Sequence, residues 1–163
     1  MPLILAFIFF SKILVVHNSK EAFYDIEKRA EKIYVLAEFP WTIRKALLDF
    51  DPELREAHCK EAFEKSLFNY VETNFKLITQ EGEVLQLYSV KEVAHVGHNH
   101  QSNFEFYFYG TNFVKLKNEL FFNITPKHKN HHRISLHYQT YQRSTTIAAP
   151  FFLLIKKIIL SDN

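Results

Sequence analysis

Two short stretches of the sequence are rich in histidine, whose imidazole nitrogens bind zinc, copper and nickel. The first stretch holds His95, His98 and His100. In an extended segment the side chains of His98 and His100 point the same way, because side chains alternate along a strand. A turn at Gly97 would bring His95 round to join them. These three residues are our first candidate ligands for zinc or copper, and the alternative is a solvated turn between two strands.

The second stretch holds His128, His131 and His132 and lies between two predicted strands. The two stretches together would supply three or four ligands, so the second set is a further, weaker candidate. Neither spacing matches a specific structural zinc motif, and no H-E-x-x-H is present. Cys59 is the only cysteine, which excludes multi-cysteine metal sites and any intrachain disulfide.

Other catalytic patterns are missing from the sequence. There is no G-x-S-x-G elbow, no phosphate-binding glycine loop and no dinucleotide fingerprint. Cys59 falls on the apolar stripe of a predicted helix, which predicts a buried, inert thiol. We therefore expect a protein that is not an enzyme and that needs no cofactor other than a zinc or copper ion.

The charge balance limits the partners. The formal net charge is +2, far from that of a polycationic nucleic-acid binder, so we expect no nucleic-acid partner. A loose basic patch is predicted from five residues, which favour either a solvated face or a contact with phosphate or anionic lipid. They are Lys115, Lys117, Lys127, Lys129 and Arg133.

The first sixteen residues carry the apolar run PLILAFIFFSKILVV. The run is too short for a comfortable membrane span but suits the core of an export signal. We expect residues 1–16 to be a signal peptide or an N-terminal anchor, with a buried first strand as the alternative. An exported chain would lie on the periplasmic or extracellular side of the cell envelope.

Aromatic residues make up 16% of the chain, with 17 phenylalanines and 8 tyrosines, which favours strands. Alternating apolar residues predict a β-hairpin with arms at 22–26 and 33–39. A short helix should follow from Trp41, and Asp51-Pro52-Glu53 is typical of the start of a second helix that runs to about Thr73.

From residue 75 onward the pattern predicts strands. A hairpin is expected around Gln80-Glu81-Gly82, joining 75–79 to 83–93, and further strands are expected at 104–109, 120–124 and 134–138. The C-terminal 147–160 is predicted as a last strand, with a short amphipathic helix against a membrane or partner as the alternative. The fold class is α+β: an antiparallel sheet or β-sandwich of six to eight strands, with a helical insertion at about 41–73, in one domain over 17–163.

Three segments resemble a family of small exported proteins of unknown function from Bacteroidetes-type bacteria. They are KIYVLAEFPWTIRKAL, NYVETNFKLITQEGEVLQL and LKNELFFNITPKHKNHHRISLHY, with His17 near the expected mature start. The resemblance implies export and a β-rich fold, and it brings no catalytic residues.

These observations predict a non-enzymatic binding or structural protein of the cell envelope. Trp41, Tyr107 and Tyr109 are the candidate contact residues for an unknown protein or envelope partner, because such rings favour interfaces. The alternative is that at least two of the three fill the core. The termini are candidates for peripheral membrane contact. The alternative function is histidine-dependent binding of zinc or copper.

Overall fold

The computed structural model describes residues 19–57, 59–93, 102–136 and 138–154. The strands are β1 (Glu21–Arg29), β2 (Lys32–Phe39), β3 (Phe75–Ile78), β4 (Leu87–Val93), β5 (Ser102–Tyr109), β6 (Lys115–Asn118), β7 (Lys129–Leu136), β8 (Gln139–Thr145) and β9 (Phe151–Leu153). The helices are α1 (Ile43–Phe50), the 3-10 turn η1 (Pro52–Arg55) and α2 (Lys60–Asn74). None of the described helices is long and apolar enough to cross a membrane.

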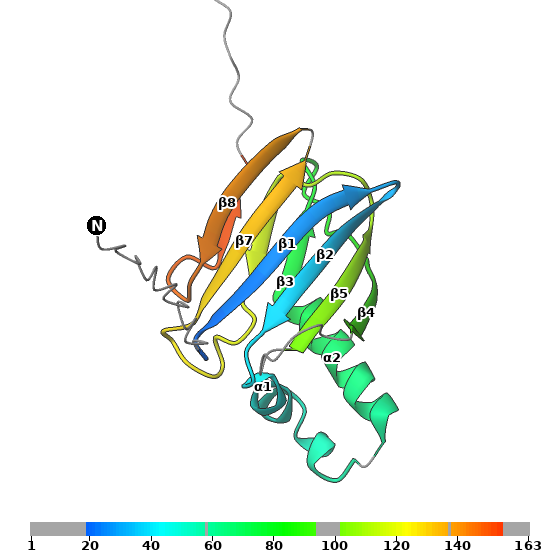
Figure 1. Cartoon of the computed structure of the whole chain (residues 1–163), viewed down its shortest axis with the longest axis vertical. Helices are drawn as coiled ribbons and strands as arrows, with labels where there is room; N and C mark the ends of the chain where they lie inside the picture. The colour runs from blue at the N-terminus through cyan, green and yellow to red at the C-terminus, as the bar shows by residue number, and fades with distance from the viewer. Residues whose placement is uncertain (1–18, 58, 94–101, 137, 155–163) are drawn as a thin grey trace, which may run out of the picture.

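Six strands form the larger sheet, in the order β4-β5-β2-β1-β7-β8 (Figure 1). The neighbours are antiparallel except β1 and β7, which run parallel and pair Ile26 with Ile134. The expected strictly antiparallel sheet is therefore wrong in this respect, and the sheet is mixed. Alternation along a strand indicates which face is buried but not which strand lies alongside, so the parallel pair could not be predicted from it.

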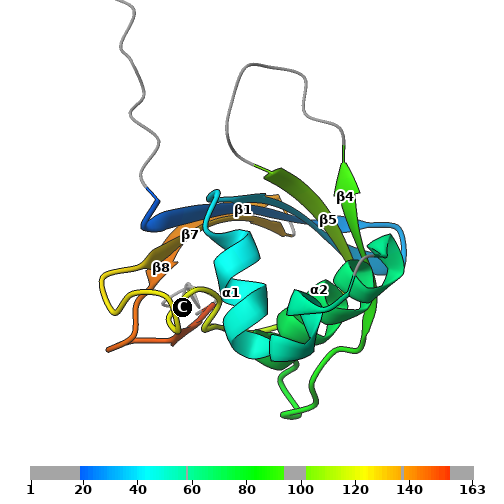
Figure 2. The ribbon, with the colours of Figure 1, turned by 90° about the horizontal axis from the view of Figure 1, so that it is seen from below.

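Three strands form the smaller sheet, in the antiparallel order β3-β6-β9. This sheet and the helices lie on one face of the larger sheet (Figures 1 and 2). Phe75 of β3 meets Phe106 and Phe108 of β5 with ring centroids 6.0 and 5.8 Å apart. The β-rich fold expected from the sequence is confirmed, and its strands fall into two sheets.

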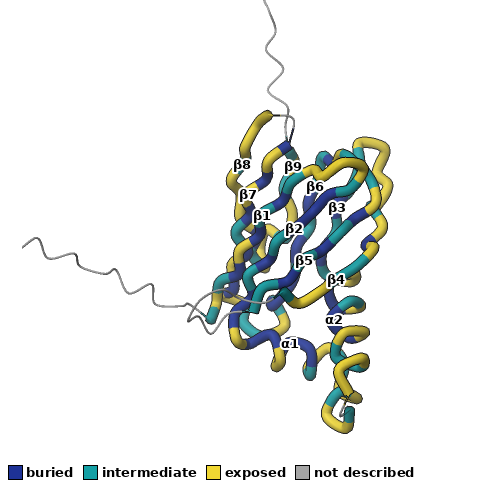
Figure 3. Tube along the Cα trace, turned by 45° about the vertical axis from the view of Figure 1, so that its right-hand side comes forward, coloured by how far each residue is buried: buried dark blue, intermediate teal, exposed yellow. Residues whose placement is uncertain are grey.

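The core lies between the larger sheet and the elements behind it, as the buried positions in Figure 3 show. The larger sheet contributes alternate residues of β1, β2, β5 and β7, such as Tyr24, Val35 and Phe106. Burying each such side chain stabilises the fold by roughly 1.5–3 kcal/mol. The prediction that Phe104, Phe106 and Phe108 share one face is confirmed, since all three are buried.

The first hairpin is confirmed, with β1 and β2 antiparallel and Ile26 opposite Val35. Its turn consists of Ala30 and Glu31, and Ala30 has a φ of +50°. Positive φ is the conformation that two-residue hairpin turns require, and an L-residue other than glycine adopts it at a cost.

The second predicted helix, starting at Asp51, is interrupted. The segment from Pro52 makes the 3-10 turn η1, and α2 begins at Lys60 after Cys59, which is extended. The stretch 51–58 offers Leu54 as its one large apolar side chain, too little to hold a helix against the core. Cys59 is exposed, so the predicted buried thiol is wrong.

The hairpin predicted around Gly82 forms only at its tip. Ile78 bridges Val84, and the Leu85 N–H donates to the Leu77 carbonyl at 2.8 Å. The chain then leaves the smaller sheet and enters the larger one as β4. Gly82 has a φ of +88°, as the turn requires.

The strand predicted at 120–124 is wrong, because these residues form turns. Leu120 and Phe121 are adjacent and both buried, and Phe121 has a φ of +67°, which no strand accommodates. The next strand, β7, starts earlier than expected, so that His131 and His132 lie inside it. The predicted last strand is confirmed in part by β9.

Candidate functional site

The face of the larger sheet that points away from the core is not covered by any described element. All other described elements lie on the opposite side of this sheet (Figures 1 and 2). The open face carries the alternate residues of each strand that the core does not use, and most of them are at least partly exposed. We call it the open face below.

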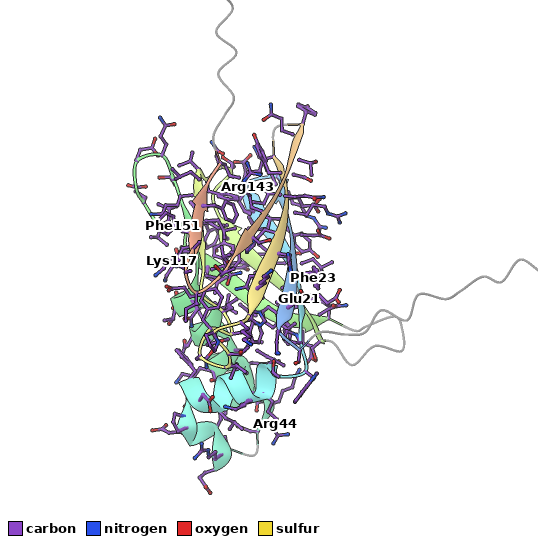
Figure 4. The ribbon with its side chains drawn as sticks, turned by 90° about the vertical axis from the view of Figure 1, so that its left-hand side faces the viewer. Glu21, Phe23, Arg44, Lys117, Arg143 and Phe151 are labelled. Carbon is purple, nitrogen blue, oxygen red and sulfur yellow. The ribbon has the colours of Figure 1, made fainter. Side chains whose placement is uncertain are left out.

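A hollow of about 770 Å³ lies on the open face over β1, β7 and β8. Cross-strand pairing brings its residues into one row, with Phe23 opposite both Glu38 and His131, and His131 opposite Ser144. Figure 4 shows Phe23 and Glu21 on this side of the molecule, away from Lys117 and Phe151. The lining includes Phe23, Asp25, Glu38, His131, Arg133, Gln142 and Ser144.

His131 contacts an aromatic ring, a hydroxyl and a carboxylate at this hollow. Its ring stacks on Phe23 with centroids 5.1 Å apart and planes 18° apart. Its Nδ1 lies 3.0 Å from Ser144 Oγ, and its Nε2 lies 3.8 Å from Glu21 Oε1. The second distance is too long for a hydrogen bond, so serine, histidine and carboxylate do not form the continuous chain that an activated nucleophile needs.

Asp25 and Arg133 form a bidentate ion pair beside the hollow. Arg133 Nε donates to Asp25 Oδ1 at 2.7 Å, and Nη2 donates to Oδ2 at 2.6 Å. Both side chains are about half exposed, so the pair adds little to stability. Its fixed fork geometry instead presents a rigid polar surface to a ligand. The same two residues line a second hollow of about 430 Å³, which continues the first along the sheet.

Aromatic rings and cations occupy the other end of the open face. The Arg29 guanidinium lies 3.4 Å from the Tyr34 ring centroid, and Lys32 Nζ lies 4.2 Å from that of Tyr88. Tyr34 packs on Tyr107, and Tyr88 on Tyr109, with centroids 5.2 and 4.9 Å apart. These contacts fix the rings in place.

A partly buried hydrogen bond anchors one of these rings. The Tyr34 hydroxyl donates to Glu105 Oε1 at 2.9 Å. Burial, followed by this bond to a carboxylate, raises the pKa of Tyr34 to about 12. The hydroxyl is protonated at neutral pH, and its bond to Glu105 holds it in one orientation.

The predicted contact residues divide between two places. Tyr107 and Tyr109 lie on the open face, whereas Trp41 lies just before α1 and is 64% exposed. Trp41 lines a separate groove of about 500 Å³ with apolar residues of α1 and α2, among them Leu47 and Phe63. Trp41 therefore does not lie on the surface that carries the two tyrosines.

The predicted metal ligands also divide. His95, His98 and His100 lie outside the described residues. His131 faces the open side, while His128 and His132 are buried on the core side. The expectation that the second histidine set lies between two strands is confirmed for His128, which precedes β7, and is wrong for His131 and His132, which lie within β7. Among the residues that the structure describes, no group of three histidine, cysteine or acidic side chains is placed to hold a metal ion.

The two buried histidines belong to a polar cluster between the two sheets. Asn118 Nδ2 lies 3.0 Å from His132 Nε2, and Asn118 Oδ1 accepts from the Leu120 N–H. The His132 Nε2 is thus the acceptor, which puts the proton on Nδ1, 3.4 Å from the Arg143 carbonyl. His132 is held as a neutral tautomer.

His128 completes the cluster through Asn130. Asn130 Nδ2 donates to the Leu120 carbonyl, so its Oδ1 is the acceptor that His128 Nε2 approaches at 3.2 Å. The Tyr24 hydroxyl also donates to this oxygen, at 3.1 Å. Burial is the main cause that lowers the pKa of His128 to about 4 and that of His132 to about 3.

This cluster could have been found in the sequence. Asn130, His132, Ile134 and Leu136 are spaced by two residues, which places the two polar side chains on the apolar face of one strand. The sequence pattern was instead interpreted as a set of metal ligands between two strands. Once the segment is a strand, the adjacent His131 and His132 face opposite sides and cannot both face solvent.

The basic residues predicted as one patch also separate. Lys129 and Arg133 lie on the open side of β7, Lys115 and Lys117 lie on β6 of the smaller sheet, and Lys127 lies in the turn between them.

A scan against models of protein families and a search of curated proteins found no match to this chain.

Proposed function

We propose that this protein is a non-catalytic binding domain on the periplasmic or extracellular side of the cell envelope, and that it holds a protein partner on the open face. The observation that carries the proposal is the open face itself, which none of the described elements covers. It presents rings and ion pairs already held in place, around two continuous hollows. The apolar N-terminal run and the resemblance to exported proteins support the location.

The chemistry of the open face favours a protein partner. Acidic and basic side chains alternate on it, as in Asp25 beside Arg133 and Glu27 beside Arg29. A surface with mixed charge does not select a polyanion such as nucleic acid. Tyrosine, phenylalanine and arginine are the residues enriched at the energetic centres of protein interfaces.

The size of the open face agrees with this. The sheet has six strands spaced by about 4.8 Å, so it is about 24 Å wide. A strand of eight residues that rise about 3.3 Å each is about 26 Å long. The area of about 600 Å² approaches the ~800 Å² that each partner contributes to a stable interface. Because the face is a paired sheet, little conformational entropy is lost when a partner binds.

Photo-crosslinking in the native envelope tests this function. A photoreactive phenylalanine analogue is introduced in place of Phe23 or Tyr107, two residues of the open face on different strands. We expect both positions to give an adduct with the same partner, and Glu38→Lys in the hollow to reduce the adduct at position 23. Phe50 on α1 is the control position, and Glu56→Lys is the control variant. Equal labelling at position 50, or no adduct at either test position, would contradict the proposal.

Binding of zinc or copper is the alternative proposal, and His95, His98 and His100 carry it. These residues connect β4 to β5, two neighbouring antiparallel strands of the larger sheet. Calorimetric titration with each metal should show binding that the double variant His98→Ala/His100→Ala abolishes. His131→Ala is the matched control on the described part of the chain, and loss of binding in that variant would contradict this assignment.

A further inference from the structure

The outer face of the smaller sheet carries lysines and exposed apolar side chains together. Strand pairing places Lys76 opposite Lys117, and Lys117 opposite Phe151. The next row pairs Ile78 with Lys115, and Lys115 with Leu153. Directly opposed residues share a face of a sheet, so all six side chains lie on the side away from the core.

This arrangement is unfavourable in water. Two lysines directly opposite each other repel and destabilise a sheet. Phe151 and Leu153 are 50% and 53% exposed, on an edge strand. Lys115 Nζ lies 4.3 Å from the Phe151 ring centroid, and Lys117 is paired with Glu119 at 2.6 Å, which leaves the face with a positive excess. A partner that is both anionic and apolar would remove both penalties.

We propose that this face docks on an anionic membrane surface. Lysines draw the domain to acidic headgroups, and an exposed aromatic ring with a neighbouring leucine enters the boundary between headgroups and acyl chains. The chain beyond β9 continues as IKKIIL at residues 155–160, with two further lysines among apolar residues. Apolar and basic chemistry thus continues along the chain from the described face.

Docking through the smaller sheet leaves the open face accessible to a partner. Figure 4 shows Lys117 and Phe151 on the opposite side of the molecule from Phe23 and Glu21. A membrane against the smaller sheet therefore leaves the larger sheet turned away from the lipid. The docking does not depend on the proposed binding partner.

A tryptophan placed at position 151 tests the docking locally. The full chain carries Phe151→Trp in a Trp41→Phe background, and its fluorescence is measured with phosphatidylcholine vesicles that contain or lack phosphatidylglycerol. We expect a blue shift and quenching by brominated lipid only when phosphatidylglycerol is present. Tyr109→Trp in the same background is the control on the open face, and it should be neither shifted nor quenched. The N-terminal apolar run is common to both chains and cannot account for a difference between them.

The lysines are tested separately. Each lysine near an anionic surface strengthens binding by about fivefold, so Lys115→Gln/Lys117→Gln should weaken vesicle binding by about 25-fold. Lys60→Gln/Lys65→Gln on α2 is the matched control and should bind as the parent does. Three results would overturn the proposal: equal quenching at positions 151 and 109, no response to phosphatidylglycerol, or a blue shift that follows protein concentration without vesicles. The last result would assign the face to a second copy of the chain.

Discussion

Asn118 of β6 and His132 of β7 meet at 3.0 Å between the two sheets, with the amide Nδ2 donating to the imidazole Nε2. Both side chains are almost fully buried, at 0% and 2% exposure. This contact fixes how the smaller sheet sits on the larger one, because a buried polar pair has few alternative partners.

Acid should destabilise the protein through its buried histidines. Their pKa values are lowered in the folded state from 6.5 to about 4 for His128 and about 3 for His132. Below pH 6.5 the unfolded chain therefore binds more protons than the folded one, and the free energy of unfolding falls as pH falls, by up to about 1.4 kcal/mol per pH unit for each histidine. Urea unfolding at a series of pH values measures this slope, and His132→Gln should reduce it.

Asn118→Ala should destabilise the fold by about 2–6 kcal/mol. The variant leaves two buried groups without a partner, the Leu120 N–H and His132 Nε2, and each costs about 1–3 kcal/mol. Chemical denaturation gives the value, with the exposed Gln142→Ala as control. A loss as small as that of the control would mean that the cluster does not join the sheets.

Phe106 and Tyr107 are neighbours on β5 and face opposite sides. Phe106→Ala should lower the free energy of unfolding by about 3–5 kcal/mol, because the cavity lies in the packed core. Tyr107→Ala should cost far less stability and should instead remove partner binding. Thermal unfolding and crosslinking at position 23, measured on both variants, separate the two effects, and a stability loss shared equally between them would disprove the assigned faces.

Ala30→Gly should stabilise the protein. Ala30 has a φ of +50° in the turn between β1 and β2, and glycine relieves the roughly 1 kcal/mol that an L-residue loses in this conformation. The greater freedom of glycine in the unfolded chain offsets part of this, so we expect a net gain of about 0.5 kcal/mol in urea unfolding. Glu31→Gly is the control in the same turn and should destabilise the protein.

Short-range patterns in the sequence predicted the elements that they directly encode. Alternation indicated the hairpin of β1 and β2 and the buried face of β5, because a strand with one face in the core must repeat every two residues. The same logic, applied to Asn130 and His132, would have placed both in the core. Their polarity suggested a loop, but partners outside the strand make their burial favourable, namely Asn118 for His132 and the Tyr24 hydroxyl and Leu120 carbonyl for Asn130.

What the sequence did not predict depends on contacts between distant segments. The pairing of β1 with β7, the departure of β4 from the smaller sheet and the turns at 120–124 are each fixed by neighbours that the local pattern does not contain. The open face is a consequence of this pairing, since it is the side on which the described part of the chain places no further element.

The β1–β7 pairing also limits how early the larger sheet can form during synthesis. Tyr24 and its partner Asn130 are 106 positions apart, so the ribosome must finish most of the polypeptide before the first hairpin gains its second neighbour. Until then β1 has a bare edge that invites pairing with other nascent chains. A chain truncated before Lys129, where β7 begins, should therefore be insoluble, even if the elements that it retains are stable on their own.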